Sequence, residues 1–254
     1  MNPEVISSYD PLYVALSFAL AFVGSFVALS AARRMIGPDG KINSFDLLAA
    51  TLALGGIGVW TMHFIGMAAL KMDLRVGYSM VETVISLVVV CAATAYGLVY
   101  VARDPSNRSR LLVAGAAVGL GVVVMHYLGM YGMRFGGYID WSTALVALSI
   151  LIAIVAATAA LWLAFNTRPV ALRLVAAVVM AVAVCAMHYT GMAAADFVCT
   201  TADRLAPPRG FGVIISTDLP DVVTIMAIGI ALVLSIDLLV QRALRSARSA
   251  RTAR

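Results

Sequence analysis

The sequence predicts an all-α integral membrane protein with seven transmembrane helices: one leading helix followed by three parallel two-helix repeats. Three observations support this fold class. Apolar residues make up 62% of the chain and charged residues only 12%, about half the charged share of a soluble domain. The mean hydropathy of +0.97 agrees with that composition. Seven apolar stretches approach the ~20 residues that a helical span needs, and a histidine motif recurs at a nearly constant interval.

The seven apolar stretches are separated by loops rich in helix breakers and charges, such as RRMIGPDGK after the first and NTRPVALR after the fifth. No basic residue precedes the first apolar run, so we interpret it as a true span rather than a cleaved signal peptide. The predicted spans are residues 12–32, 45–70, 80–102, 111–133, 143–166, 174–195 and 222–240.

The distribution of basic residues predicts the orientation in the membrane. Of the 18 lysines and arginines, 13 fall on the side of the C-terminus and five on the side of the N-terminus. Because cytoplasmic loops are enriched in basic residues, the N-terminus is predicted outside and the C-terminus inside. The predicted organisation is a short outer segment at 1–11, a seven-helix domain at 12–240 and a basic cytoplasmic tail at 241–254.

All three histidines of the chain, His63, His126 and His188, lie in one pattern, Met-His-x-x-Gly-Met. The copies read MHFIGM, MHYLGM and MHYTGM, and their histidines are 63 and 62 residues apart. Each repeat therefore contains a helix that ends in the motif and a helix that returns. At ~1.5 Å per residue, the histidines lie at similar depth in the outer half of the membrane.

The motif favours a metal site. A histidine and the methionine four residues later share a helix face, and the glycine between them leaves room for an ion, a small ligand or a neighbouring helix. Imidazole suits copper, zinc, iron and nickel, whereas thioether sulfur selects copper(I). A ligand set without carboxylates or thiolates therefore indicates copper before zinc. The three copies offer up to three imidazoles and six thioethers, for one shared centre or several. The spacing glycines are Gly66, Gly129 and Gly191.

Each copy of the motif also has a purely structural interpretation. A single intramembrane histidine commonly forms hydrogen bonds between packed helices, and methionine commonly fills gaps in a core. However, the three copies take every histidine and six of the 13 methionines of the chain. Because ionisable groups inside a membrane are usually functional, this concentration favours a site over packing alone.

The triple motif, its period and the seven spans resemble the MHYT-domain family of bacterial integral membrane sensor proteins over residues 10–240. The resemblance implies copper bound through methionine and histidine and the sensing of a diatomic gas (O2, CO or NO), with a signal passed to a cytoplasmic partner. Redox or copper state is a further candidate signal. Only the third copy spells MHYT, and Phe64 replaces the tyrosine in the first. By position, the implied metal ligands are Met62, His63, Met67, Met125, His126, Met130, Met187, His188 and Met192.

Two other functions remain open. A copper-handling transporter would use the same ligands, although here they cluster in the outer half instead of crossing the membrane. Haem held by two of the histidines is the second alternative, since axial histidine is a common haem ligand. No nucleophile–base pair or phosphate-binding loop is present, so enzymatic activity is not predicted.

The segment after the seventh span, QRALRSARSARTAR, carries five arginines. Basic residues next to a span commonly contact anionic membrane lipid, and the orientation rule already accounts for these, so nucleic-acid binding is not expected. The family is often fused to cyclic-di-GMP or histidine-kinase output modules. The sequence is compatible with a sensor that signals through a partner and with a segment of a longer protein.

Overall fold

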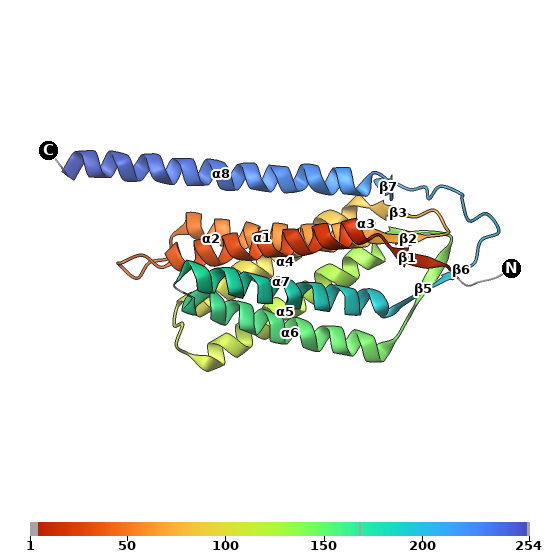
Figure 1. The fold of residues 1–254 in the computed structure, drawn as a ribbon, viewed down its shortest axis with the longest axis horizontal. Coiled ribbons are helices and arrows are strands. Elements are labelled where there is room, and N and C mark those ends of the chain that lie inside the picture. The colour runs from red at the N-terminus through yellow and green to blue at the C-terminus, as the bar shows by residue number, and fades with distance from the viewer. Residues whose placement is uncertain (1–4, 168, 253–254) are drawn as a thin grey trace.

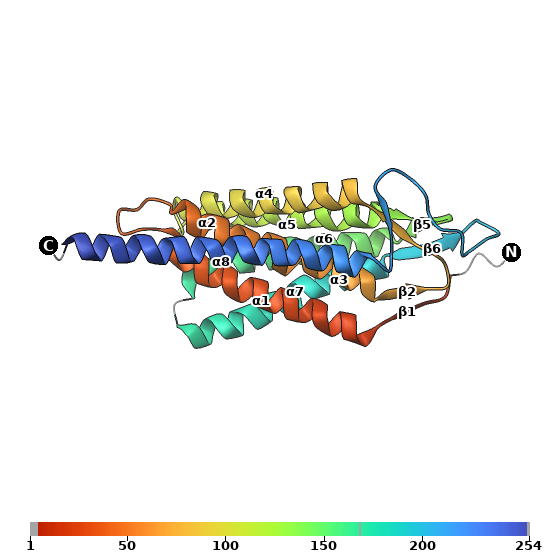
Figure 2. The same ribbon diagram turned by 90° about the horizontal axis from the view of Figure 1, so that it is seen from above.

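The computed structural model describes residues 5–167 and 169–252, which form a bundle of helices lying side by side (Figures 1 and 2). Within these residues, seven helical segments are long and apolar enough to cross a membrane. The predicted fold class is confirmed, and the chain is a multi-pass membrane protein. The segments are α1 (Pro11–Met35), the continuous run of α2 (Ser44–Thr51), η1 (Leu52–Thr61) and α3 (Met62–Ala69), α4 (Met80–Ala102), α5 (Arg108–Tyr131), α6 (Thr143–Asn166), α7 (Val170–Ala193) and α8 (Leu219–Thr252).

Local capping explains where the helices begin. The Asn107 side chain accepts a hydrogen bond from the Arg110 backbone N–H at 3.1 Å, which satisfies a free donor of the first turn. For this reason α5 begins at 108, earlier than the predicted 111. Pro169 precedes the first turn of α7, which begins at 170 instead of 174. Hydropathy alone locates the apolar stretch and not these first turns, which contain Arg108 and Arg110 in α5 and Arg173 in α7.

The second span is not a regular α-helix throughout. From Leu52 to Thr61, in the sequence LALGGIGVWT, it is a π-helix. The Thr61 hydroxyl donates a 3.0 Å hydrogen bond to the carbonyl of Gly56, five residues earlier. On the neighbouring helix α1, Gly24 lies so close that a Cβ there would overlap the backbone of Gly58. Because π-turns inside helices are frequent at functional sites, it is relevant that this one ends just before His63.

Six of the helices form a ring with approximate three-fold repetition. The motif helices are α3 with η1, α5 and α7. Helix α4 contacts η1 and α5, α6 contacts α5 and α7, and α1 contacts α7, η1 and α3. The leading helix α1 thus takes the place of the third returning helix. Helix α8, which follows the third motif in sequence, packs instead on the outside of η1 and α3 (Figures 1 and 2).

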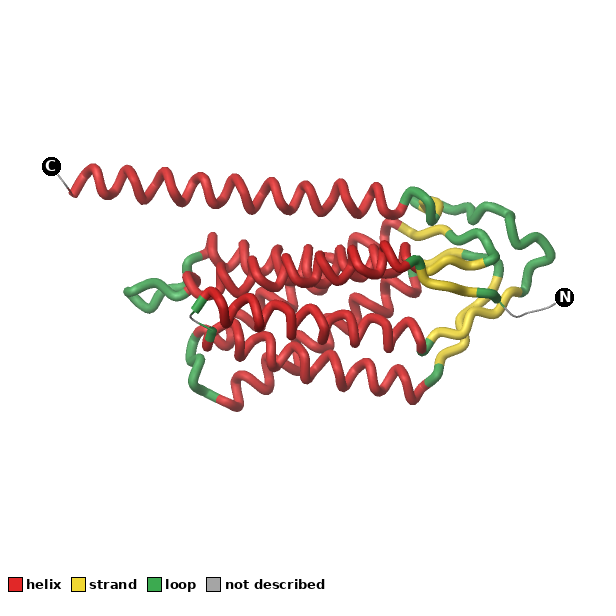
Figure 3. Tube along the Cα trace, in the orientation of Figure 1, coloured by secondary structure: helices red, strands yellow, loops and turns green. Residues whose placement is uncertain are grey.

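Short β-strands connect the helices at one end of the bundle, where the sequence predicted outer loops (Figure 3). Each strand that follows a motif helix pairs with one that precedes a returning helix, so the cap repeats the three-fold pattern of the ring. A seventh strand extends the middle ladder. The antiparallel pairs are β1 (Ser7–Tyr9) with β2 (Leu70–Met72), β3 (Gly77–Ser79) with β4 (Met133–Arg134) and with β7 (Val213–Ile215), and β5 (Gly137–Trp141) with β6 (Ala195–Cys199).

The end of the bundle away from the strand cap carries the start of α2 and the end of α8. There Asp46 is fully buried and pairs with Arg34 of α1 at 2.9 Å. Helix α8 continues beyond the predicted boundary at 240 to Thr252, so its backbone extends past the other helices (Figure 1). Arg168 and Arg254 lie outside the described residues, as do the side chains of the other four tail arginines.

Candidate metal centre

The three histidines, separated by about a quarter of the chain from one another, meet in one cluster. His63 comes from α3, His126 from α5 and His188 from α7, and all three are buried, with exposures of 0%, 1% and 1%. Their ring centroids lie 4.9 Å apart for His63 and His126, 5.0 Å for His63 and His188, and 5.3 Å for His126 and His188. The three-fold arrangement of the motif helices therefore converts a sequence repeat into one compact group.

The rings turn the same nitrogen toward one another. Nδ1 of His63 lies 3.1 Å from Nδ1 of His188 and 3.1 Å from Nδ1 of His126. Donors bound to one tetrahedral ion at ~2.0 Å would lie about 3.3 Å apart, so this spacing suits a shared ion. An imidazole nitrogen has one proton or one lone pair in the ring plane. The two contacts of His63 Nδ1 therefore cannot both be well-formed hydrogen bonds, whereas a central cation would accept all three lone pairs.

The opposite nitrogens, the three Nε2 atoms, face the motif glycines. A Cβ on Gly129 would overlap Nε2 of His63, one on Gly191 would overlap that of His126, and one on Gly66 would overlap that of His188. Each histidine thus lies against the glycine of the next motif helix in the same direction around the ring.

No Nε2 atom of the cluster has a hydrogen-bond partner among the described residues. In a neutral imidazole whose Nδ1 lone pair binds an ion, the ring proton is on Nε2. The glycines, in turn, provide the space in which the rings sit. The sequence alone did not show whether the space beside each glycine holds an ion, a small ligand or a neighbouring helix. In the structure, a histidine ring of the neighbouring motif helix fills it.

The six motif methionines are all buried, with exposures of 0–2%, but they occupy different surroundings. The second methionine of each copy belongs to the core cluster around the histidines on the side of the strand cap. Among the first methionines, Met125 joins that cluster, Met62 packs with Ala21 and Ala181, and Met187 lines a separate cavity. The structure brings the histidines to ligand distance, and the thioether ligands stay a prediction.

The returning helices contribute a feature that the motif did not reveal, a buried serine at equivalent positions. Ser17 of α1, Ser86 of α4 and Ser149 of α6 are each 0% exposed. Each hydroxyl donates to the carbonyl three residues earlier, at 2.7, 2.7 and 2.8 Å. Ser86 and Ser149 are 63 residues apart, which repeats the histidine interval and is the signal that could have identified them.

These serines tie the motif helices to the returning helices. The Tyr127 hydroxyl lies 2.7 Å from Ser149 Oγ, and the Tyr189 hydroxyl lies 3.0 Å from Ser17 Oγ. In the first copy, where phenylalanine replaces the tyrosine, the indole N–H of Trp60 donates to the equivalent serine on α4 at 3.1 Å. The tyrosine of the motif is thus a link between helices that another donor replaces in the first copy.

A cavity of about 170 Å³ lies beneath the strand cap, lined by Met67, Lys71, Met72 and Tyr78 among others. The Lys71 ammonium donates to the carbonyl of Ala68 at 3.1 Å. Burial raises the pKa of the Tyr78 phenol, so its hydroxyl stays neutral. Because Met67 follows the first motif histidine by one helical turn, this cavity approaches the histidine cluster from the strand side.

Two segments of the chain, residues 56–114 and 119–177, match the family model MHYT, described as a bacterial signalling protein N-terminal repeat. The chain is 35% identical to the bifunctional diguanylate cyclase/cyclic di-GMP phosphodiesterase MucR of Pseudomonas aeruginosa, over 91% of the chain and 34% of the relative. It is 33% identical to the cyclic di-GMP phosphodiesterase NbdA of the same organism, over 74% and 24%.

A third relative, the signaling protein YkoW of Bacillus subtilis, is 28% identical over 81% of the chain and 26% of the relative. The chain therefore spans about a third or a quarter of the length of these curated relatives. No solved structure matches it.

Proposed function

The chain belongs to the MHYT-domain family of bacterial membrane sensor proteins, and from this premise we propose that it binds copper through its three histidines. We further propose that it senses a diatomic gas, or the redox state of the copper, and signals to the cytoplasm. A membrane signalling role follows from the family and from the seven spans. The convergence of three buried Nδ1 atoms supports the metal.

The surroundings of the cluster favour a monovalent ion. Among the described residues, no carboxylate or thiol joins His63, His126 and His188 in this group, so it offers an ion three imidazoles and no anionic acidic or thiolate ligand. The Born cost of burying a charge grows with its square, so a divalent ion would be about four times as costly as a monovalent one. Neutral imidazoles supply no compensating charge. Copper(I) therefore suits the site better than zinc. The thioether sulfur atoms of the buried motif methionines are soft ligands, which also select copper(I) over zinc.

Copper bound there would supply a redox-active centre with affinity for diatomic gases. The residues of the chain would orient and isolate it. The glycines fix the ring positions, and the buried methionines and aromatic side chains exclude water. The close packing of the three rings, with centroids 4.9–5.3 Å apart and Nδ1 of His63 3.1 Å from Nδ1 of each of the other two, leaves no space for the flat macrocycle that separates two axial histidines of a haem. This supports copper over haem.

The three ligand helices give the centre a mechanical connection to the rest of the bundle. A change in the spacing of the histidines would move α3, α5 and α7 relative to one another. The tyrosine–serine contacts extend such a movement to α1 and α6. Helix α8 packs on η1 and α3 and continues to Thr252. We therefore assign α8 the role of carrying the signal to a cytoplasmic domain or partner.

Two relatives act on cyclic di-GMP according to their names, so the proposed recipient is an output module or partner of that kind. We propose no catalytic activity and no nucleic-acid ligand for the chain itself. Membrane lipid surrounds the bundle in this proposal. A role in copper transport would instead require flux, which copper uptake into vesicles containing the protein would reveal.

The test is metal analysis of the purified full chain in mild detergent, by elemental mass spectrometry with an absorption spectrum of the same sample. The wild type is compared with a variant in which all three histidines are alanine. A matched control replaces the three buried serines by alanine, which removes contacts between the motif helices and the returning helices without removing a nitrogen ligand. Copper in the wild type and the serine control, and none in the folded histidine variant, is expected. A Soret band would reassign the site to haem. No metal in the wild type after copper(I) reconstitution would overturn the proposal.

A further inference from the structure

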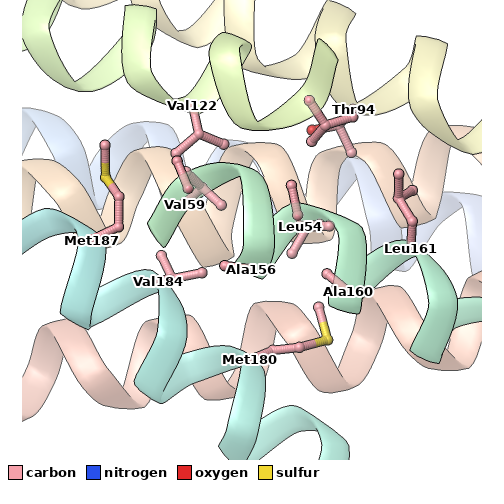
Figure 4. Close-up of a pocket in the computed structure, with 13 residues that line it drawn as sticks. Leu54, Val59, Thr94, Val122, Ala156, Ala160, Leu161, Met180, Val184 and Met187 are labelled. Atoms are coloured by element: carbon pink, nitrogen blue, oxygen red, sulfur yellow. The ribbon is translucent and has the colours of Figure 1, made fainter. Parts of the chain in front are cut away.

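A second cavity lies one helical turn from the histidines, on the side away from the strand cap. Its volume is about 40 Å³, and it is lined by Val59, Val122 and Val184 among others (Figure 4). Each of these valines precedes its motif histidine by four residues. The helix sides that present the three histidines therefore present three valines at the next level, and the cavity continues the three-fold axis of the site.

The lining of this cavity is almost entirely apolar. Small side chains of α6, including Ala156, leave the space open, and Met187, the neighbour of the third motif histidine, borders it (Figure 4). The polar side chain in the lining is Thr94, whose hydroxyl already donates to the carbonyl of Val90 at 2.7 Å. A ligand in the cavity would therefore meet hydrocarbon and thioether groups.

These properties select a class of ligand. A buried water needs two to four polar partners, which this lining does not offer, so the cavity disfavours water. Its volume is about three times the ~10–15 Å³ that a single water-sized probe occupies, which accommodates two bonded heavy atoms. Ions are excluded by the cost of burying an unpaired charge. Small uncharged, weakly polar molecules remain, and they also partition readily from the hydrocarbon of a membrane into an apolar space.

We propose that this cavity, which we call the valine cavity, is a docking site for a diatomic gas beside the histidine cluster. The inference rests on the proposed function in one respect: it takes the histidine cluster, one helical turn away, as the centre at which the gas reacts. The valine cavity would then concentrate O2, CO or NO next to the centre and exclude water and anions from the same approach.

Xenon is the probe for the cavity, since it is apolar, monatomic and binds in apolar protein cavities without any metal. The full chain is labelled with 13C at the methionine methyl groups, kept metal-free in lipid nanodiscs and titrated with xenon by NMR. Saturable shifts are expected at Met187 and Met180, which line the valine cavity. Met35 is fully buried and outside that lining, and it serves as the internal reference. Shifts that rise linearly and equally at all three would overturn the proposal.

Ala156→Leu fills the cavity from α6. The matched control is Ala159→Leu, the same change at an exposed position of the same helix. We expect Ala156→Leu to abolish saturable xenon shifts and to slow the reaction of the copper-loaded protein with CO or NO at least tenfold, with unchanged copper content. Ala159→Leu should match the wild type in both measurements. Val184→Phe narrows the same space from α7 and replaces Ala156→Leu if that variant does not fold.

The outcomes separate this inference from the proposed function. Saturable xenon binding in a chain that binds no copper supports the cavity and overturns the metal site. A copper-loaded chain whose gas reaction is unaffected by Ala156→Leu overturns the docking site and leaves the metal site intact.

Discussion

Nε2 of His63 occupies the space that a side chain on Gly129 would need. These residues belong to different copies of the motif and to different helices, so the position of one ring depends on the absence of a side chain on the next helix. The relation recurs between His126 and Gly191 and between His188 and Gly66. The motif is therefore completed between copies, and each glycine serves the histidine of another repeat.

Gly129→Ala is expected to disturb the site directly. Its Cβ would overlap the ring of His63, which must move away from the other two Nδ1 atoms. Replacement of a group that orients a metal ligand typically costs 10–100-fold in affinity, so we expect a copper(I) affinity lower by about that factor, measured by competition with a chromogenic chelator. Gly229→Ala on α8 is the control, because its Cβ would meet no atom within 4 Å. Equal affinities in the two variants would contradict the proposed geometry.

Single histidine variants test whether one ion is shared. If three Nδ1 atoms bind one ion, His63→Gln, His126→Gln and His188→Gln should each remove most of the bound copper, because each leaves two imidazoles. Glutamine keeps a polar side chain of similar size in the buried position. Elemental analysis of each purified variant gives the copper content. Loss of a third of the copper in each variant would indicate separate sites instead of a shared one.

The thioether ligands predicted from the sequence need their own test, since the motif methionines have different surroundings. Replacing Met67, Met130 and Met192 together by leucine keeps apolar volume, and such exchanges usually cost less than ~1.5 kcal/mol each in stability. If their sulfur atoms bind, copper(I) affinity should fall roughly tenfold while zinc affinity changes little, because thioethers select copper(I). Met35→Leu is the control outside the motif. Unchanged copper(I) affinity in the triple variant would restrict the ligands to the histidines.

Much of this architecture could be predicted from the sequence, for identifiable reasons. Spans of ~20 apolar residues and the common depth of three histidines follow from hydropathy and helix rise. The orientation of the rings does not, because it depends on contacts such as His63 with Gly129 between distant segments. The π-helix at LALGGIGVWT reads as an ordinary apolar helix, and the close approach of Gly24 on α1 to its Gly58 is a contact between distant segments that hydropathy does not express.

The role of the leading helix likewise could not be predicted from the sequence and follows from the packing of the helices. Helix α1 lies between α7 and η1, and its Ser17 meets Tyr189 as Ser149 meets Tyr127. Sequence order places α8 in the third repeat, whereas packing places α1 there. The ring closes because the first helix of the chain packs against the last motif helix. No local sequence pattern predicts this contact.

The hydroxyl pairs are expected to support stability more than metal binding. Tyr127→Phe removes the 2.7 Å contact with Ser149. It introduces phenylalanine, the residue that the first copy of the motif has at the same position, Phe64. A buried hydrogen bond contributes about 0.5–1.5 kcal/mol, so we expect a small decrease in thermal unfolding temperature with full copper content. The double variant with Ser149→Ala should lose little more than Tyr127→Phe alone. A loss of copper in Tyr127→Phe would instead place this hydroxyl in the site.

The orientation in the membrane follows from the basic residues and is open to direct measurement. With the C-terminus in the cytoplasm, α8 would deliver a signal inside the cell, and the strand cap with its cavity at Met67 and Lys71 would face outward. A fluorescent protein fused after residue 254 should then fluoresce, whereas alkaline phosphatase fused there should be inactive because it requires the oxidising exterior. Fusions after Asp104, in the predicted inner loop, should behave alike, and fusions after Arg204, in the predicted outer loop, should show the opposite pattern. An active phosphatase at the C-terminus would reverse the assignment, and the histidine cluster would then lie near the cytoplasm, where copper and gas would reach it from within the cell.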